Sequence, residues 1–219
     1  MTAVALPRLI PAPTGKPVRS GAVDTQRRAL QIARDPSSWD AREASATASR
    51  FDDLAALWDD ERASYRPAPL ADALARGGPW PLGRCIEIGS GTGVLTPLVS
   101  AQWDDTVCVD LSAGMLVRSR WRVRIQADAA KLPFRSNSAV AVVLGDAPLF
   151  AHEIVRVLVR AGVVIWVNAL GSDAPYFLPT NEITGALERA STRPWSSVES
   201  QALWGRWVVL RQSGLAQQV

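Results

Sequence analysis

The sequence has few residues of the kinds that bind metals or form disulfides. It contains two cysteines, Cys85 and Cys108, and one histidine, His152. A structural zinc site needs four such ligands in a cluster, so we expect no metal site. Both cysteines fall within apolar runs. We therefore expect them to be buried thiols of a cytoplasmic protein rather than a disulfide.

Long apolar runs and an excess of charge are missing too. No stretch approaches the ~20 apolar residues needed to span a bilayer, and Pro7 and Arg8 interrupt the N-terminus before a signal-peptide core could form. Lys and Arg number 24 against 21 Asp and Glu, with no dense basic stripe. We therefore expect no membrane partner and regard nucleic acid as an unfavoured one; no pattern in the sequence indicates an oligomeric state.

The composition favours a single folded domain. Of the 219 residues, 47% are hydrophobic and 21% charged, which is typical of a globular protein. Residues 1–35, with prolines and scattered arginines, are predicted to be a flexible N-terminal arm. Residues 36–219 are predicted to be the domain, with a helical lid over 36–80 and a core over 81–219. In the lid, apolar residues recur at helical spacing as far as Trp58, and prolines separate this helix from a short one over Leu70–Arg76.

Strand and helix patterns alternate along the core. Continuous apolar runs of this kind are typical of parallel strands that are buried on both faces. The last two strand patterns leave too little chain between them for a crossover helix, and they are predicted to form an antiparallel hairpin. The expected strands are 84–88, 106–110, 123–127, 140–145, 163–168, 197–203 and 206–211, and the expected helices are 94–103, 112–118, 149–158 and 182–189.

A glycine-rich turn follows the first core strand. It reads Cys85-Ile86-Glu87-Ile88-Gly89-Ser90-Gly91-Thr92-Gly93. Glycines allow positive φ angles and bring the backbone close to a ligand, and the helix start beyond them offers free N–H groups. A dinucleotide site requires G-x-G-x-x-G, whereas Val94 holds the place of the third glycine here. The pattern is E-x-G-x-G-x-G, which indicates a nucleotide-like ligand of another kind.

Acidic residues also mark the ends of the strands. Glu87 leads into the glycine turn, Asp110 ends the second strand, and Asp128 and Asp146 follow the third and fourth. In a parallel sheet these ends lie at one edge, where ligands bind. An acid at the position of Asp110, about 20 residues beyond the first glycine, is suited to accept hydrogen bonds from ribose hydroxyls.

Taken together, these strings resemble the class I S-adenosylmethionine-dependent methyltransferases. The chain reads Val-Asp-Leu-Ser-x-x-Met-Leu from Val109 and Ala-Asp-Ala-x-x-Leu-Pro-Phe from Ala127. These strings are similar to the type-11 group, which includes quinone-biosynthesis enzymes. Residues 153–158, Glu-Ile-Val-Arg-Val-Leu, look like that group as well, although the following turn at 160–163 lacks its usual proline and second glycine. The resemblance covers about 82–168, and more loosely the terminal hairpin.

The resemblance implies an α/β fold: a Rossmann-like, doubly wound, seven-stranded sheet that is mostly parallel, with a C-terminal antiparallel hairpin and an N-terminal helical lid. It also implies transfer of a methyl group from S-adenosyl-L-methionine to a small-molecule acceptor by in-line displacement. The glycines would lie against the methionine part of the cofactor, Glu87 would accept from its ammonium group, Asp110 would bind its ribose, and Asp128 would accept from the adenine amino group. The implied cofactor-binding residues are Glu87, Gly89, Ser90, Gly91, Gly93, Asp110, Leu111, Met115, Asp128, Ala129 and Gly145.

The catalytic residues are less clearly indicated. A sulfonium is an activated methyl donor, so a base is needed only if the acceptor arrives protonated. The candidates are His152, Asp146 and Tyr176, with Asp173 as a further acceptor contact. In the lid, Trp39 and Trp58 could stack on a flat substrate or fix the lid to the core. Arg62 or Arg66 could meet the cofactor carboxylate, although a solvated helix face is favoured for both.

Several other functions fit the sequence less well. An NAD-dependent oxidoreductase is disfavoured by the glycine spacing, and neither Tyr65 nor Tyr176 begins a Tyr-x-x-x-Lys pair. The chain lacks the Asn/Asp-Pro-Pro-Tyr/Phe string of amino-group methyltransferases and a loop cysteine of the RNA cytosine type. A non-catalytic cofactor-binding protein remains an alternative. So does a methyltransferase acting on RNA or protein, because the arm from Arg8 to Arg34 could contact a polyanion.

Overall fold

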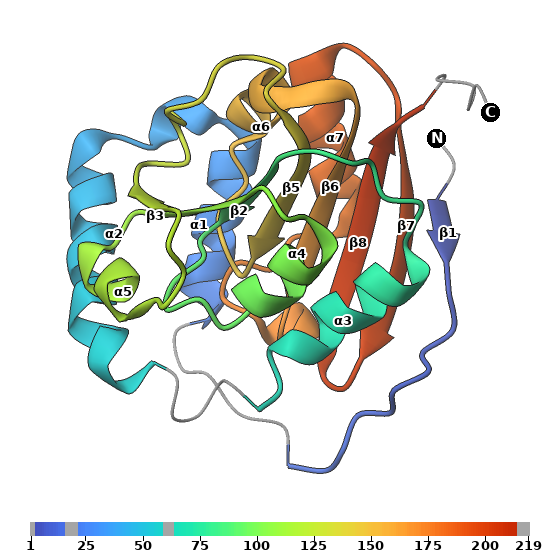
Figure 1. The fold of residues 1–219 in the computed structure, drawn as a ribbon, viewed down its shortest axis with the longest axis horizontal. Coiled ribbons are helices and arrows are strands. Elements are labelled where there is room, and N and C mark those ends of the chain that lie inside the picture. The colour runs from blue at the N-terminus through green and yellow to red at the C-terminus, as the bar shows by residue number, and fades with distance from the viewer. Residues whose placement is uncertain (1–2, 16–21, 59–63, 214–219) are drawn as a thin grey trace.

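The computed structural model describes residues 3–15, 22–58 and 64–213, which form one sheet with helices on both of its faces (Figure 1). The strands are β1 (Ala3–Ala5), β2 (Cys85–Ile88), β3 (Thr106–Asp110), β4 (Arg124–Gln126), β5 (Ala139–Gly145), β6 (Leu158–Asn168), β7 (Trp195–Ala202) and β8 (Gly205–Gln212). The α-helices are α1 (Ala22–Arg34), α2 (Ala41–Leu54), α3 (Pro67–Arg76), α4 (Thr96–Gln102), α5 (Ala113–Arg118), α6 (Ala151–Val157) and α7 (Thr180–Ser191). Short 3-10 helices are η1 (Pro36–Ser38), η2 (Ala55–Leu57) and η3 (Gly171–Asp173).

The strand order is β1-β7-β8-β6-β5-β2-β3-β4. Strands β2 to β6 are parallel, β8 runs antiparallel between β6 and β7, and β1 is parallel to β7. The mostly parallel sheet and its antiparallel hairpin are therefore confirmed, whereas the expected number of seven strands is wrong, because β1 adds an eighth. The chain order reverses between β2 and β5, and this is the place where open α/β sheets bind ligands.

Alternation along the central strands divides the core into two layers. In β5, Val142 and Leu144 belong to a cluster that α1, α6 and α7 cover, while Ala141 and Val143 belong to a second cluster that α3 and α4 cover. All four side chains are at most 1% exposed. Burial on both sides explains why these strands read as continuous apolar runs in the sequence.

The described part of the N-terminal segment is packed against the core, which corrects the expected flexible arm. Strand β1 pairs with β7, and α1 lies against α7. Ala29 and Ala33 of α1 are 0% and 4% exposed. The side-chain amide of Gln26 donates to the carbonyls of Ser172 and Ala174, both at 2.8 Å. The prolines of this segment indicated disorder. However, a strand of three residues fits between prolines, and the small alanines of α1 allow this helix to pack closely against the core.

The elements of the expected lid do not lie together. Helix α2 begins at the Asp40 cap and lies beside α5 at one end of the molecule, whereas α3 packs on the face of the sheet that α4 also covers, against β8 and α4 (Figure 1). Of the described residues of the expected lid, those that reach the ligand-binding edge described below are Trp39, Trp58, two residues of α2, and Arg66 at the start of α3. Within the described ranges, every helix is too short or too polar to cross a bilayer.

Candidate active site

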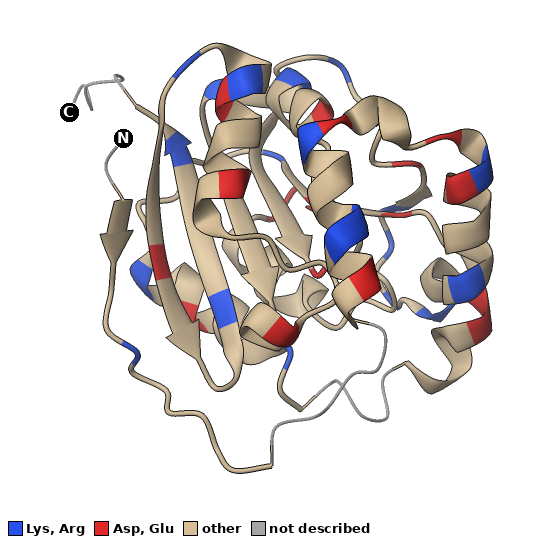
Figure 2. Cartoon of the chain, turned by 180° about the vertical axis from the view of Figure 1, so that it is seen from behind, with Lys and Arg blue, Asp and Glu red and all other residues tan. Residues whose placement is uncertain are grey.

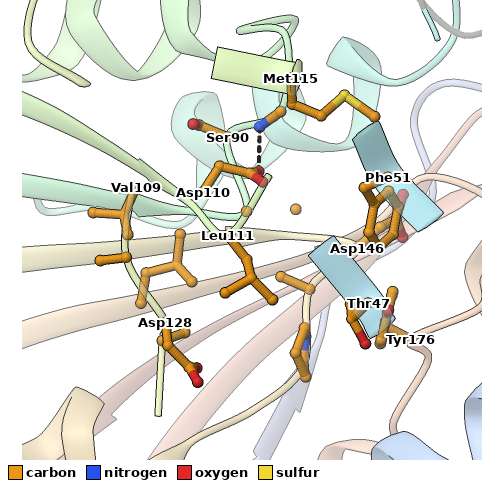
Figure 3. A pocket seen from close by; sticks show the side chains of 18 of the residues that line it. Thr47, Phe51, Ser90, Val109, Asp110, Leu111, Met115, Asp128, Asp146 and Tyr176 are labelled. Atoms are coloured by element: carbon orange, nitrogen blue, oxygen red, sulfur yellow. Dashed lines mark hydrogen bonds between the residues drawn. The ribbon is translucent and has the colours of Figure 1, made fainter. Parts of the chain in front are cut away.

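A cavity opens where β2, β3 and β5 end (Figure 3). One wall comes from the glycine turn and the end of β3, and the facing wall comes from α2 and the residues after it. Because the sheet supplies the first wall and a separate helix supplies the second, the cavity is formed only by the tertiary fold. Its lining includes Trp39, Thr47, Phe51, Trp58, Arg66, Gly89, Ser90, Gly91, Val94, Leu95, Val109, Asp110, Leu111, Met115, Ala127, Asp128, Ala129, Gly145, Asp146, Ala147, Pro148, Phe150 and Tyr176.

The glycine turn has a backbone that other residues would strain. Gly89 and Gly91 have φ angles of 69° and 56°, in the left-handed region that glycine adopts readily. A Cβ atom on Gly89 would lie 2.7 Å from the Cβ of Ala147. A Cβ on Gly91 would project between Trp58 and Met115, at 3.7 and 3.9 Å from their nearest atoms. The absence of side chains therefore creates part of the cavity.

Asp110 is fixed at the edge of this cavity. Its Oδ2 accepts the N–H of Gly91 at 2.7 Å, and its Oδ1 accepts the N–H of Ser112 at 2.9 Å. Burial raises the pKa of this carboxyl, and the backbone hydrogen bonds oppose the rise. Each carboxylate oxygen has a second lone pair, so the group can still accept hydrogen bonds from a ligand.

Glu87 and Gly93 do not line the cavity, although the sequence placed them with the other cofactor residues. Glu87 is 1% exposed within β2, and its Oε2 accepts the Thr96 hydroxyl at 2.7 Å. Burial raises its pKa to about 7. A Cβ on Gly93 would face the hydroxyl of Ser119 at 2.9 Å. The other nine expected positions line the cavity.

Trp39 contacts the acid that was expected to bind adenine. Its indole N–H donates to Oδ2 of Asp128 at 2.9 Å, and the N–H of Ala130 donates to Oδ1 at 2.8 Å. The indole ring also packs edge-on against Phe150, with ring centroids 5.4 Å apart. Trp39 therefore closes the cavity at the end of β4. The sequence alone did not decide whether Trp39 stacks on a substrate or fixes the lid to the core.

The sequence favoured a solvated helix face for Arg66, but the structure buries this side chain. It is 8% exposed, and its Nη2 lies 3.5 Å from Oδ2 of Asp146. The guanidinium also lies 5.3 Å from the ring centroid of Trp58. Among the residues that the structure describes, its buried Nε–H has no hydrogen-bond partner, and such groups are costly unless a ligand or water satisfies them. Arg62 lies outside the described residues.

The catalytic candidates separate in the structure. Asp146 and Tyr176 line the cavity, whereas His152 is exposed on α6 and Asp173 is exposed in η3, both outside its lining. Asp146 accepts the N–H of Ala169 at 3.2 Å and pairs with Arg66. Burial raises the pKa of Tyr176 to about 12. His152 therefore does not line the cavity in which a catalytic base would act.

The side chain of Asp52 connects helix α2 to the residues that follow β3. Asp52 accepts the Ser112 hydroxyl and, at 2.8 Å, the N–H of Gly114. These two hydrogen bonds lower the pKa of Asp52. The same helix brings Thr47 and Phe51 into the cavity. Sequence reasoning did not assign Thr47 and Phe51 to the site; the signal would have been their four-residue spacing on the helix.

Comparison with known protein families identifies one domain in this chain. Residues 86–166 match the type-11 family model, which is described as a methyltransferase domain. No curated protein matches the sequence at a significant level.

Solved structures with similar folds include one complex with SAH and two SAM-dependent methyltransferases. A complex of DhpI with SAH is 20% identical, with a TM-score of 0.61, covering 77% of this chain and 96% of that one. A SAM-dependent methyltransferase from Thermotoga maritima is 18% identical (TM-score 0.57; 74% and 98% covered). Another from Aquifex aeolicus is 14% identical (TM-score 0.53; 74% and 97% covered). At these identities the likeness shows the shared fold.

Proposed function

We propose that this chain, whose residues 86–166 form a methyltransferase domain, transfers the methyl group of S-adenosylmethionine to a small-molecule acceptor. The enzyme class and the cofactor expected from the sequence are in agreement with the matched domain. The resemblance to the quinone-biosynthesis subgroup rests on the sequence strings alone, and no acceptor is assigned from it.

The residues that line the cavity fit this cofactor. Asp110 offers a fixed carboxylate for the ribose hydroxyls, and Asp128 with Ala129 offers an acceptor and a donor for adenine. The glycine turn leaves room for the methionine part. The observation that carries the proposal is the Nε–H of Arg66, a buried cationic donor that no described residue engages and that belongs to a side chain lining the same cavity as these acids. We assign it to the cofactor carboxylate, since an arginine binds carboxylates through charge-assisted hydrogen bonds.

The side chains around the cavity orient the reactants and exclude water. Bound S-adenosylmethionine supplies a methyl group that is already activated on a sulfonium. Tyr176, with a pKa of about 12, keeps its proton at neutral pH and can donate a hydrogen bond to the acceptor. Asp146 holds Arg66 in place and has oxygens engaged by that arginine and by Ala169. Neither residue is suited to be a strong base, so the chain acts mainly by alignment.

A small-molecule acceptor is favoured over a polyanion by the state of the basic N-terminal residues. Arg27 pairs with Asp24, Arg28 with Glu43, and Arg34 with Glu182. Seen from behind, basic and acidic residues are interspersed along the helices (Figure 2). Each of these three arginines has an acidic partner that offsets its charge, so the three do not form a basic surface.

The proposal is tested by titration calorimetry with S-adenosylhomocysteine, with NADH in parallel. We expect micromolar binding of the first and none of the second. Asp110→Ala should weaken binding about 10- to 100-fold, because hydrogen bonds to charged groups contribute roughly 1.5–3 kcal/mol. Asp104→Ala, a change at an exposed aspartate outside the cavity, is the matched control. A wild-type protein that bound neither S-adenosylhomocysteine nor S-adenosylmethionine would refute the proposal. A protein that bound them but turned over no acceptor would favour the non-catalytic alternative.

A further inference from the structure

A second cavity adjoins the first one, between α1, α2 and the chain that follows β6. The two cavities share five lining residues: Phe51, Trp58, Arg66, Asp146 and Tyr176. A molecule in the second cavity would therefore lie directly against a ligand in the first. This is the relation that a methyl acceptor needs to its donor.

Most of the residues that line the second cavity are apolar, and several of them are buried. Tyr65, Leu170 and Ala174 line it and are 5%, 3% and 0% exposed. The loop that carries Ala174 is tied to α1 by Gln26, which donates to two of its carbonyls. Phe51, Tyr65 and Tyr176 add aromatic faces, which pack well against flat rings. The shape and chemistry favour a planar apolar body.

The described residues that line the second cavity carry a net positive charge. Arg66 and Asp146 offset each other as an ion pair. Arg50 of α2 also lines the cavity, and among the described residues no hydrogen bond or ion pair engages its guanidinium. Arg50 and Tyr176 line the same cavity, and the Arg50 cation lowers the pKa of Tyr176 against the rise that burial causes. The Tyr176 hydroxyl, which keeps its proton, adds a neutral donor beside this cation.

We propose that the second cavity is the acceptor site and that it selects a flat aromatic molecule carrying an acidic group and a ring hydroxyl. The inference rests on the proposed function and names its substrate class. Arg50 pairs with the acidic group, and the aromatic side chains hold the ring. The phenolic oxygen forms the bond to the methyl carbon as the bond from that carbon to sulfur breaks; the electron pair stays on sulfur and the hydroxyl proton passes to solvent. A cationic amine is disfavoured because Arg50 would repel it.

The test uses the full chain saturated with S-adenosylhomocysteine. Three probes of similar shape are titrated calorimetrically at pH 7.5: 4-hydroxybenzoate, which is anionic, 4-hydroxybenzyl alcohol, which is neutral, and tyramine, which is cationic. We expect the anion to bind about tenfold more tightly than the other two. Arg50→Gln should remove that preference and leave the binding of the neutral probe unchanged, and Arg50→Lys should restore part of it. Arg42→Gln, an exposed change on the same helix outside both cavities, is the control.

The outcomes separate this inference from the proposed function. If S-adenosylhomocysteine does not bind, the proposed function fails. If it binds but no probe does, or if the neutral or cationic probe binds as tightly as the anion, the assignment of the acceptor class is overturned. An anion preference that survives Arg50→Gln would equally overturn the role given to Arg50. Unchanged S-adenosylhomocysteine binding in each variant shows that the variant has folded.

Discussion

Glu87 makes the stability of this protein depend on pH in a direction opposite to that of most carboxylates. It lies within β2 at 1% exposure, and burial raises its pKa from 4.5 to about 7. In the unfolded chain the group loses its proton near pH 4.5, whereas in the folded protein it keeps the proton until about pH 7. Between these values the folded state binds more protons. The free energy of unfolding therefore falls as pH rises through this window.

The size of the effect follows from the shift. A difference of two to three pKa units corresponds to about 3 kcal/mol at about 1.4 kcal/mol per unit. Most of it, about 2.5 kcal/mol, falls between pH 5 and pH 8. Glu87→Gln keeps the shape and an oxygen acceptor for the Thr96 hydroxyl, and it cannot ionise. Relative to the wild type, this variant should gain about 2.5 kcal/mol of stability between pH 5 and pH 8.

Denaturant unfolding followed by tryptophan fluorescence measures this difference at fixed ionic strength. Comparing the variant with the wild type at each pH cancels the titration of all other groups. Glu182→Gln is a control of opposite sign, because the hydrogen bond from Arg34 lowers the pKa of Glu182. That variant should lose stability at neutral pH, and the loss should disappear as pH falls. A Glu87→Gln difference that stayed constant between pH 5 and pH 8 would refute the argument.

Two further predictions concern the attachment of α2 and the glycine turn. Asp52→Ala removes the hydrogen bonds to Ser112 and Gly114. Calorimetry should show S-adenosylhomocysteine binding weakened about three- to tenfold, and Asp53→Ala next to it should leave binding unchanged. Gly89→Ala and Gly15→Ala both place a side chain at positive φ, which costs about 1–3 kcal/mol, but only at Gly89 would the new Cβ meet another atom, at 2.7 Å. Denaturant unfolding should therefore show a larger loss for Gly89→Ala, and equal losses would contradict the close contact.

The sequence predicted the central sheet well because its signals are local. β3 has the same bounds as the expected strand, and β5 and β6 contain theirs entirely. Because the central strands are buried on both faces, their apolar residues follow one another directly in the sequence. The strand-end acids were found for the same reason, since the end of a strand also marks the edge of the site.

The parts that the sequence missed depend on contacts between distant segments. β1 is a strand only because β7 offers it an edge, and three residues carry no period of their own. The alanines of α1 form a weak apolar pattern that becomes a packing surface only against α7. Trp39 reaches Asp128 across 89 positions in the sequence. The burial of Arg66 could not be predicted from the sequence either, because it depends on the ion pair with Asp146.

The hydrogen bonds around Asp110 connect the α2 helix to the ligand-binding edge of the sheet. Ser112 donates its N–H to Asp110 and its hydroxyl to Asp52 of α2, while Gly91 of the glycine turn donates to the other oxygen of Asp110. The carboxylate that would hold the ribose is thus oriented by the same residue that anchors α2. A ligand that fixes Asp110 should then also stabilise the docked position of α2. Because coupling between two sites is reciprocal, docking of α2 should stabilise the bound ligand by the same free energy. A change at Asp52 that undocks α2 should therefore weaken ligand binding. Since α2 also carries Arg50 and Phe51 into the second cavity, filling the first cavity would help to order the second. We therefore expect the acceptor to bind more tightly after the cofactor than before it.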